Sequence, residues 1–311
     1  MNQTLVIGST VIDVLIKLPV LPRQGDDINI TACEYRIGGC AYNVYKMLRL
    51  FNSPALLCSP VGTGKYAQMV REQFEKDKLC PFAVLEKENG CCYCLIEPTG
   101  ERTFLSYHGA EYTFSRSWME KIDYSQIGGV YISGIDIEEP TGDEIIEFVY
   151  EHPSLELFFS VGPRIKHIHP EKLERLLCRR DMSGKGPFLH LNENEILSFS
   201  GKNGVKEGAE FLAEKTENSI VVTLGERGCY CLEWTGGDRA DRDRIGDRWH
   251  CINGFPAQVI DTVGAGDAHF GTIIACLKEG ISLEEACLQA NRIGAAVVGI
   301  SGAILNKLPC F

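Results

Sequence analysis

The chain has 311 residues, of which 44% are hydrophobic, so it is long enough for one large α/β domain or two small ones. Its formal charge of -11, without a cluster of Lys or Arg, excludes a nucleic-acid partner but leaves room for a small anion held by backbone N–H groups. No apolar run reaches membrane length and no basic leader precedes the first strand, so we expect a cytoplasmic protein with no membrane partner, whose cysteines are buried, reduced thiols.

Short apolar strands alternate with helical patterns along most of the chain. Strands are predicted at 3–8, 54–60, 128–133, 155–160, 187–191 and 219–224, and helices at 40–51, 65–78, 141–151, 170–180 and 204–216, with two more helices after residue 261. This alternation predicts an α/β fold, with a doubly wound, mainly parallel sheet flanked by helices. In such sheets, ligands bind at the carboxyl ends of the strands.

Two regions interrupt the alternation. Residues 11–18 and 28–36, and later 91–97 and 103–108, have the pattern of paired strands without a helix between them. They predict a small antiparallel sheet that serves either as a lid over the site or as a dimer surface. The α/β domain would then comprise 1–10, 37–90 and 113–311, and the lid would comprise 11–36 and 91–112. A mixed-charge stretch at 236–248 is expected to be a solvated loop, because it lacks the closing Glu of a calcium loop.

Polar side chains follow the first strand and open the first helix. Asp13 offers a carboxylate that is a paired acceptor for vicinal hydroxyls, although Asp is also common in turns. Gly38 and Gly39 allow a ligand to approach the backbone, and Asn43 projects from the first helical turn with both a donor and an acceptor.

The run Asp261-Thr262-Val263-Gly264-Ala265-Gly266-Asp267 is the most informative part of the chain. Its small residues let backbone N–H groups surround an anion, and the apolar spacing that follows places Gly266 and Asp267 at a helix N-terminus. Asp267 is therefore predicted to be a general base beside an anion hole formed by Gly264, Ala265 and Gly266. The alternative is that Asp267 only caps the helix.

Together with Asn192-Glu193-Asn194-Glu195 and Thr223-Leu224-Gly225-Glu226-Arg227-Gly228, these motifs resemble the ribokinase-like, or PfkB, carbohydrate kinase family over nearly the whole chain. The resemblance implies that a sugar hydroxyl is held by Asp13 and Asn43, loses its proton to Asp267 and attacks the γ-phosphoryl group of ATP.

The resemblance also implies residues for the nucleotide and for metal ions. Asn192 and Glu195 would orient phosphate oxygens and the water shell of Mg²⁺, with a helix cap as the alternative for this pair. The resemblance further implies a nucleotide loop with Thr223, Gly225 and Gly228 and an adenine contact at Asn291. Some members of the family have a K⁺ site, which would here include Asp261 and the carbonyl of Val263.

Some positions depart from the family pattern. Ser160 stands where the family commonly has Asp, Gly64 where many members have Asp, and Tyr42 where a small residue is frequent. Arg164 would pair with the substrate or with an acidic neighbour, and His108 is a weaker substrate candidate on the lid.

We therefore expect an ATP- and Mg²⁺-dependent kinase that phosphorylates a hydroxymethyl group of a small sugar or sugar acid. A nucleoside kinase of the same fold and a catalytically silent sugar-binding sensor are the alternatives, and the lid edge leaves a homodimer open.

Overall fold

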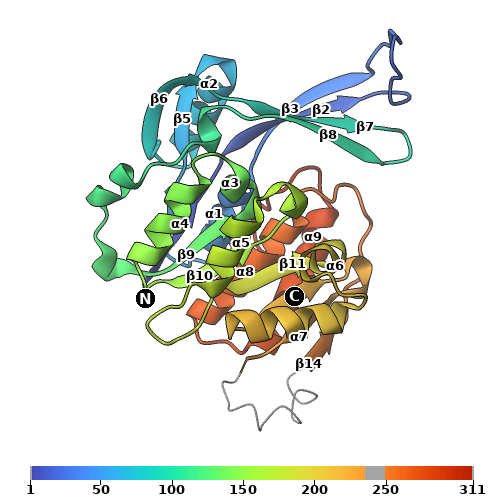
Figure 1. Cartoon of the computed structure of the whole chain (residues 1–311). Helices are drawn as coiled ribbons and strands as arrows, with labels where there is room; N and C mark the ends of the chain where they lie inside the picture. Colours follow the sequence, from blue (N-terminus) through green and yellow to red (C-terminus); the bar gives the residue numbers. More distant parts are fainter. Residues whose placement is uncertain (1, 235–248, 310–311) are drawn as a thin grey trace.

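A computed structural model describes residues 2–234 and 249–309 (Figure 1). Within these residues the larger part of the molecule, which we call the body, is built on an eight-stranded sheet in the order β14-β13-β12-β11-β10-β9-β1-β4. The strands are β1 (Gln3–Ile7), β4 (Ala55–Cys58), β9 (Ile127–Ser133), β10 (Glu156–Ser160), β11 (Phe188–Asn192), β12 (Ile220–Thr223), β13 (Cys229–Leu232) and β14 (Trp249–Ile252). The pairs from β12 to β14 are antiparallel and the others are parallel, which confirms the predicted sheet.

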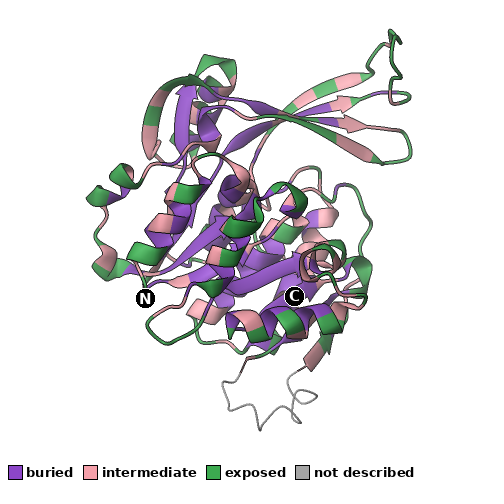
Figure 2. Cartoon of the chain, in the orientation of Figure 1, coloured by how far each residue is buried: buried purple, intermediate pink, exposed green. Residues whose placement is uncertain are grey.

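Helices cover both faces of this sheet, and its strands are therefore largely buried (Figure 2). One face carries α4 (Gly142–Glu151), α5 (Pro170–Cys178) and α7 (Val205–Thr216), and the other carries α1 (Cys40–Leu50), α8 (Ala265–Lys278) and α9 (Leu283–Val298). Successive side chains of β1 alternate between the two cores: Leu5 packs in the first and Val6 in the second. Burial on both faces explains why the strands are apolar throughout rather than alternating in polarity.

Several short elements were not predicted. The predicted strand 54–60 is divided, because β4 ends at Cys58 and β5 (Pro60–Thr63) pairs in parallel with β6 (Ala83–Glu88) in a separate sheet. This two-stranded sheet packs with α2 (Gly64–Lys76). The other additions are α3 (Gly134–Glu138), α6 (Glu193–Ser200) and the 3₁₀ turns η1 (Ala110–Tyr112), η2 (Arg116–Lys121), η3 (Tyr124–Gln126), η4 (Ile165–His167) and η5 (Gly225–Arg227).

A four-stranded sheet, which we call the lid sheet, extends from one end of the body (Figure 1). Its order is β3-β2-β7-β8, with β2 (Val11–Lys17), β3 (Ala32–Gly38), β7 (Cys91–Ile96) and β8 (Arg102–Tyr107). The two outer pairs are antiparallel, as the sequence predicts. The central pair, β2 with β7, is parallel, a pairing that the sequence pattern did not indicate.

The remaining expectations concern thiols, charge and membranes. The cysteines of the described residues are free; Cys58, Cys229 and Cys287 are buried, whereas Cys178 is exposed, so the prediction of burial is wrong there. The charged stretch 236–248 lies outside the described residues. In the described ranges, none of the helices has the length and apolarity needed to cross a bilayer.

Candidate active site

The site begins where the order of the main sheet reverses, between β1 and β9. The Ser9 N–H donates to Asp136 Oδ1 over 3.1 Å, and the Ser133 hydroxyl donates to Asp136 Oδ2 over 2.6 Å. Asp136 from α3 therefore joins the carboxyl ends of the two strands, where doubly wound sheets bind ligands. Gly8 leaves room for this carboxylate, since an added Cβ would lie 2.4 Å from Asp136 Oδ2. Burial raises the pKa of Asp136 to about 7.

Asp13 lies on β2 beside this reversal, and Gly38 on β3 makes space for it. A Cβ at Gly38 would lie only 2.3 Å from Asp13 Oδ2, so a larger residue there would displace this carboxylate. The pKa of Asp13 is raised to about 7, first by burial and then by the negative charges of Asp267 and Asp261, while Arg102 opposes the shift. Although the two residues are far apart in the sequence, the fold thus brings Asp267 close enough for its negative charge to raise the pKa of Asp13.

Asn43 in the first turn of α1 provides the direct contact to Asp267. Gly39, with φ of 99°, allows the chain to turn tightly against Ser9 before α1 begins. Asn43 Nδ2 then donates to Asp267 Oδ2 over 2.9 Å. Asn43 is only 5% exposed, and its Oδ1 has no hydrogen-bond partner among the described residues. Such a buried, free acceptor suits a ligand hydroxyl group.

Asp267 occupies the first turn of α8, which begins after Gly264 in the left-handed region with φ of 73°. Its carboxylate makes no capping bond to the helix backbone and instead accepts from Asn43 and the Cys40 thiol. The alternative of a helix cap is therefore not what the structure shows. Burial raises the pKa of Asp267 to about 6, and the bonds from Asn43 and Cys40 oppose the rise. At neutral pH the carboxylate is ionised and able to accept a proton.

Unused backbone donors accompany this carboxylate. Among the described hydrogen bonds, none uses the N–H of Gly264, Gly266 or Asp267, whereas the N–H of Ala265 donates to Thr262 O over 3.4 Å. A Cβ added at Gly266 would meet nothing within 4 Å, so this side of the helix end is open. The first turn of α8 can therefore hold an anion beside Asp267.

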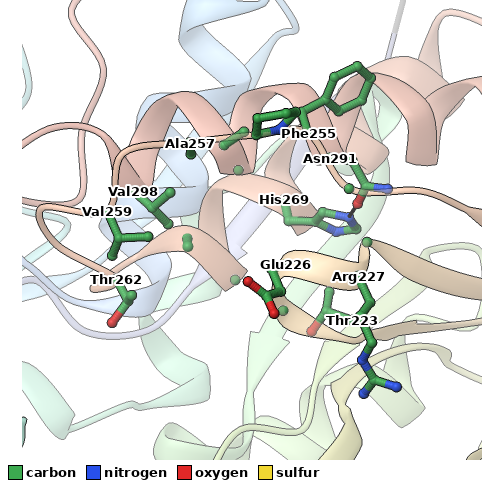
Figure 3. A pocket seen from close by; sticks show the side chains of 18 residues that line it. Thr223, Glu226, Arg227, Phe255, Ala257, Val259, Thr262, His269, Asn291 and Val298 are labelled. Atoms are coloured by element: carbon green, nitrogen blue, oxygen red, sulfur yellow. Dashed lines mark hydrogen bonds between the residues drawn. The ribbon is translucent and has the colours of Figure 1, made fainter.

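A pocket of about 760 Å³ opens next to these donors (Figure 3). It lies between the η5 turn and the helices α8 and α9, and apolar side chains such as Phe255, Val259 and Val298 form part of its wall. Of the predicted nucleotide residues, Thr223, Gly225, Gly228 and Asn291 line it, together with Gly266, whereas Asn192 does not. The pocket thus combines an apolar wall with anion-binding N–H groups at one end.

The side-chain amide of Asn291 is already hydrogen-bonded within the protein. Its Nδ2 donates to the carbonyls of Ile252 and Asn253 over 3.0 and 3.1 Å, so its Oδ1 accepts from His269 Nε2 over 3.0 Å. His269 Nδ1 must then accept from His190 Nε2, 3.0 Å away, and burial lowers the pKa of His190. Asn291 therefore shapes the pocket wall and fixes the position of His269.

Asn192 and Glu195 form a reciprocal cap on α6. The Glu195 N–H donates to Asn192 Oδ1 over 2.9 Å, and the Asn192 N–H donates to Glu195 Oε2 over 3.0 Å. This is the alternative that the sequence left open for this pair. Glu195 still belongs to the site, because its pKa is raised by burial and by the charge of Asp267.

Magnesium fits these carboxylates only through water. Glu195 and Asp267 bring two nearby negative charges without a cationic side chain acting on either of them. Within the described residues, no three His, Cys, Asp or Glu side chains converge on one point. The donor set therefore fits an ion that keeps most of its hydration shell, as Mg²⁺ does.

The substrate candidates Arg164 and His108 are each paired within the protein. Arg164 contacts Glu138 through Nε and Nη2, which is the acidic neighbour that the sequence left open. His108 pairs with the adjacent Glu139 and stacks on Tyr112.

Asp261 does not present a free carboxylate to a K⁺ ion. It accepts the N–H groups of Val263 and Gly302 over 2.8 and 3.0 Å, and Arg102 Nη1 lies 2.6 Å from its Oδ1. Sequence reasoning missed Arg102, Asp136 and His269. Arg102 and Asp136 belong to no motif, and His269 was hidden within the apolar pattern of α8.

Known proteins match this chain over nearly its whole length. Residues 1–309 match the pfkB family carbohydrate kinase. The chain is 32% identical over 302 residues to the uncharacterized sugar kinase YegV of Escherichia coli, covering 97% of this chain and 90% of that protein.

Solved structures share the fold. The Arabidopsis thaliana ribokinase complexed with ribose and ATP superposes with a TM-score of 0.74 at 19% identity, covering 97% of this chain and 94% of that one. The adenosine kinase of Sinorhizobium meliloti superposes with a TM-score of 0.78 at 18% identity, covering 98% and 96%.

Proposed function

Because the chain belongs to the pfkB family of carbohydrate kinases, which are phosphotransferases, we propose that it transfers the γ-phosphoryl group of ATP to a hydroxymethyl group of a small sugar or sugar acid. The observation that carries this proposal is the contact between Asn43 and Asp267 beside the unused N–H groups of α8. A base, a free acceptor for a hydroxyl group and an anion-binding turn meet there.

The reaction needs positioning and electrostatic stabilisation more than covalent catalysis. Asp13 and Asn43 Oδ1 would accept hydrogen bonds from substrate hydroxyls and orient the reacting group toward Asp267. Asp267 takes the proton as the hydroxyl oxygen attacks, and the N–H groups of Gly264 and Gly266 stabilise the charge that develops on the phosphoryl group.

ATP is proposed as the donor because the 760 Å³ pocket leads to those N–H groups and because the related ribokinase is complexed with ATP. Glu195 would hold the water shell of a Mg²⁺ ion, which neutralises phosphate charge when it is bound. His108 and Arg164 remain proposed as groups that shape the substrate site, His108 through its hydrogen bond with Glu139 and Arg164 through its ion pair with Glu138.

The lid sheet is proposed to cover the sugar and, through its outer face, to form a homodimer. The proposal is supported by Asp13, which lies on β2 of this sheet and senses the charge of Asp267; segments 11–36 and 91–112 would then exclude water from the sugar. On the face away from Asp13, the exposed side chains form an apolar group made of Tyr35, Tyr93, Leu105 and Tyr107. Exposed apolar groups of this kind mark association surfaces.

The test of the function is ADP production over a panel of pentoses, hexoses, aldonic acids, keto-deoxy acids and nucleosides. We expect a free sugar or sugar acid to have the highest kcat/KM. A preference for nucleosides would instead assign the activity of the adenosine kinase relative. Binding of a sugar without any ADP release would favour a sensor, which the intact base and anion turn argue against.

The base is tested with Asp267→Asn, which keeps the shape of the side chain but cannot accept the proton. We expect kcat to fall by about 10²- to 10⁴-fold while ATP binding measured by calorimetry stays near the native value. Asp27→Asn, an exposed site on the lid, is the matched control and should keep native activity. An unchanged kcat in folded Asp267→Asn would refute the assignment.

A further inference from the structure

The ion pair between Arg102 and Asp261 joins two parts of the chain that the sequence does not connect. Arg102 is the first residue of β8 in the lid sheet, and Asp261 precedes the anion turn of the body. Their side chains are 13% and 4% exposed, so the pair is almost wholly removed from water. A buried carboxylate needs such a partner, because an unpaired buried charge is strongly disfavoured.

Asp261 shapes the anion turn directly. Its two oxygens hold the N–H groups of Val263 and Gly302, and thereby fix two loops against each other. The loops touch closely, since a Cβ at Gly264 would lie 2.2 Å from the Cβ of Ala303. The charge state of Asp261 therefore affects the turn that presents the N–H groups of Gly264 and Gly266.

Charged side chains of both signs surround the pair, and Asp13 adds a further carboxylate near it. A cavity of about 110 Å³ beside it is lined by the carboxylates Asp261 and Glu34 and by the cations Arg102 and Lys17. The contact of Arg102 Nη1 is an ion pair and not an aligned hydrogen bond, so the guanidinium acts there as a nearby positive charge. A metal cation added at Asp261 would meet this fixed positive charge 2.6 Å from the oxygen it needs.

We propose that Arg102 is a positioning residue that supplies the permanent positive charge for Asp261, so that the anion turn keeps its shape without K⁺ or another monovalent cation. Because Arg102 belongs to β8, its contact with Asp261 also fixes the position of the lid sheet relative to the anion turn. The role of the pair in phosphoryl transfer rests on the proposed function, whereas its effect on the fold does not.

The first experiment needs no substrate. Thermal unfolding of the native protein is compared in potassium chloride and choline chloride at equal ionic strength. We expect equal midpoints in the two salts, because Asp261 already has its cation. A midpoint that is higher in potassium chloride alone would overturn the inference, and this result stands whether or not the protein is a sugar kinase.

The second experiment removes the guanidinium with Arg102→Ala. We expect a lower midpoint and a kcat reduced by about tenfold, a size typical of coupling through a packed network, with both partly restored by K⁺ or methylguanidinium but not by choline. Arg102→Lys keeps the charge and should remain insensitive to the cation. Arg116→Met, which breaks an exposed ion pair with Glu151, is the control and should behave as the native protein.

The remaining outcomes also decide the matter. Native activity of Arg102→Ala in both salts would overturn the inference, because the charge would then be dispensable. A deficit that neither K⁺ nor methylguanidinium relieves would show that the positive charge is not what Arg102 contributes, and would equally overturn the inference. Should Arg102→Ala fail to fold, the comparison of salts on the native protein and on Arg102→Lys still tests cation independence.

Discussion

Single side chains determine the protonation chemistry of this site, because one buried carboxylate, Asp136, and two partly buried ones, Asp13 and Asp267, lie close to the reversal of the main sheet. The pKa of Asp267 is raised to about 6, and those of Asp13 and Asp136 to about 7. Burial is the main cause of the raised pKa in each case; negative neighbours add to the shift at Asp13, whereas hydrogen bonds oppose it at Asp267 and Asp136.

We predict that kcat depends on pH through Asp267. A general base works only when ionised, so kcat should fall about tenfold per pH unit below a pH of about 6 and stay level above it. Initial rates at saturating substrate between acid and neutral pH measure this limb. The residual activity of Asp267→Asn should lack it; the same acid limb in that variant would assign the titration to another group.

We predict that Asp13→Asn raises the KM for the sugar more than it lowers kcat. The carboxylate has two acceptor oxygens for substrate hydroxyls, and the amide keeps only one. Steady-state kinetics with the substrate identified by the panel measure the split, and the KM for ATP serves as the internal control. A native KM for the sugar would remove Asp13 from the binding site.

We predict that Asp136→Asn stabilises the fold above neutral pH. The folded-state pKa of about 7 lies above the unfolded value of 3.8, so the native protein loses free energy of unfolding as pH rises from about 4 to about 7. An amide can still accept from Ser9 N–H and can donate to the Ser133 hydroxyl. The gain at pH 8 should be on the order of 3 kcal/mol, measured by denaturant unfolding. Asp27→Asn is the control, and an unaltered pH dependence in Asp136→Asn would contradict the prediction.

At the scale of elements, the start of α8 depends on one glycine and tolerates change at another. Gly264 combines φ of 73° with a neighbour, Ala303, that leaves no space for a Cβ. Gly266 lies inside the first turn with open space beside it.

We therefore predict that Gly264→Ala lowers the stability by at least about 2 kcal/mol, because alanine is disfavoured in the left-handed region and the added methyl collides. Gly266→Ala should keep the fold or gain up to about 1 kcal/mol, since alanine is favoured within a helix. Calorimetric unfolding of the two variants gives the comparison. Equal stability of the two would contradict the reported geometry of the turn.

The elements also show where sequence reasoning succeeds and where it stops. Strands such as β1 and helices such as α1 follow from apolar periodicity, because the pattern encodes burial directly. The motif around Asp267 could also be identified, because glycines and a carboxylate at the start of a helix indicate an anion-binding turn from the local sequence alone.

Contacts between distant segments could not be predicted. The role of Asn291 was assigned from its position, but its amide is occupied by backbone carbonyls and His269, which no local pattern shows. Arg102 belongs to no sequence motif, and its partner lies in another part of the chain. Asp136 follows a strand as many unrelated Asp residues do, and only the folded sheet places it against Ser9.

At the scale of the whole molecule, the lid sheet leaves an apolar face uncovered on a protein whose net charge is -11. Repulsion between like charges opposes association, so the exposed lid side chains must supply the attraction if copies pair.

We predict a dimer that dissociates on replacing two of these side chains, Tyr93→Lys with Leu105→Lys, because two buried lysines would lack partners. Sedimentation equilibrium measures the mass. The matched control is Val84→Lys with Met182→Lys, two exposed apolar side chains outside the lid sheet, which should leave the mass unchanged. A native protein that is monomeric throughout would remove the dimer proposal.

The parallel pairing of β2 with β7 has a consequence for synthesis of the chain. β2 and β3 leave the ribosome long before β7, and until then one long edge of their hairpin has no strand to bond. That edge is open to other chains during this interval. Once β7 binds there, the hairpin of β2 and β3 and the hairpin of β7 and β8 share one hydrogen-bonded sheet. A cut in the turn before β8 would then leave the lid sheet attached to the body through both β2 and β7.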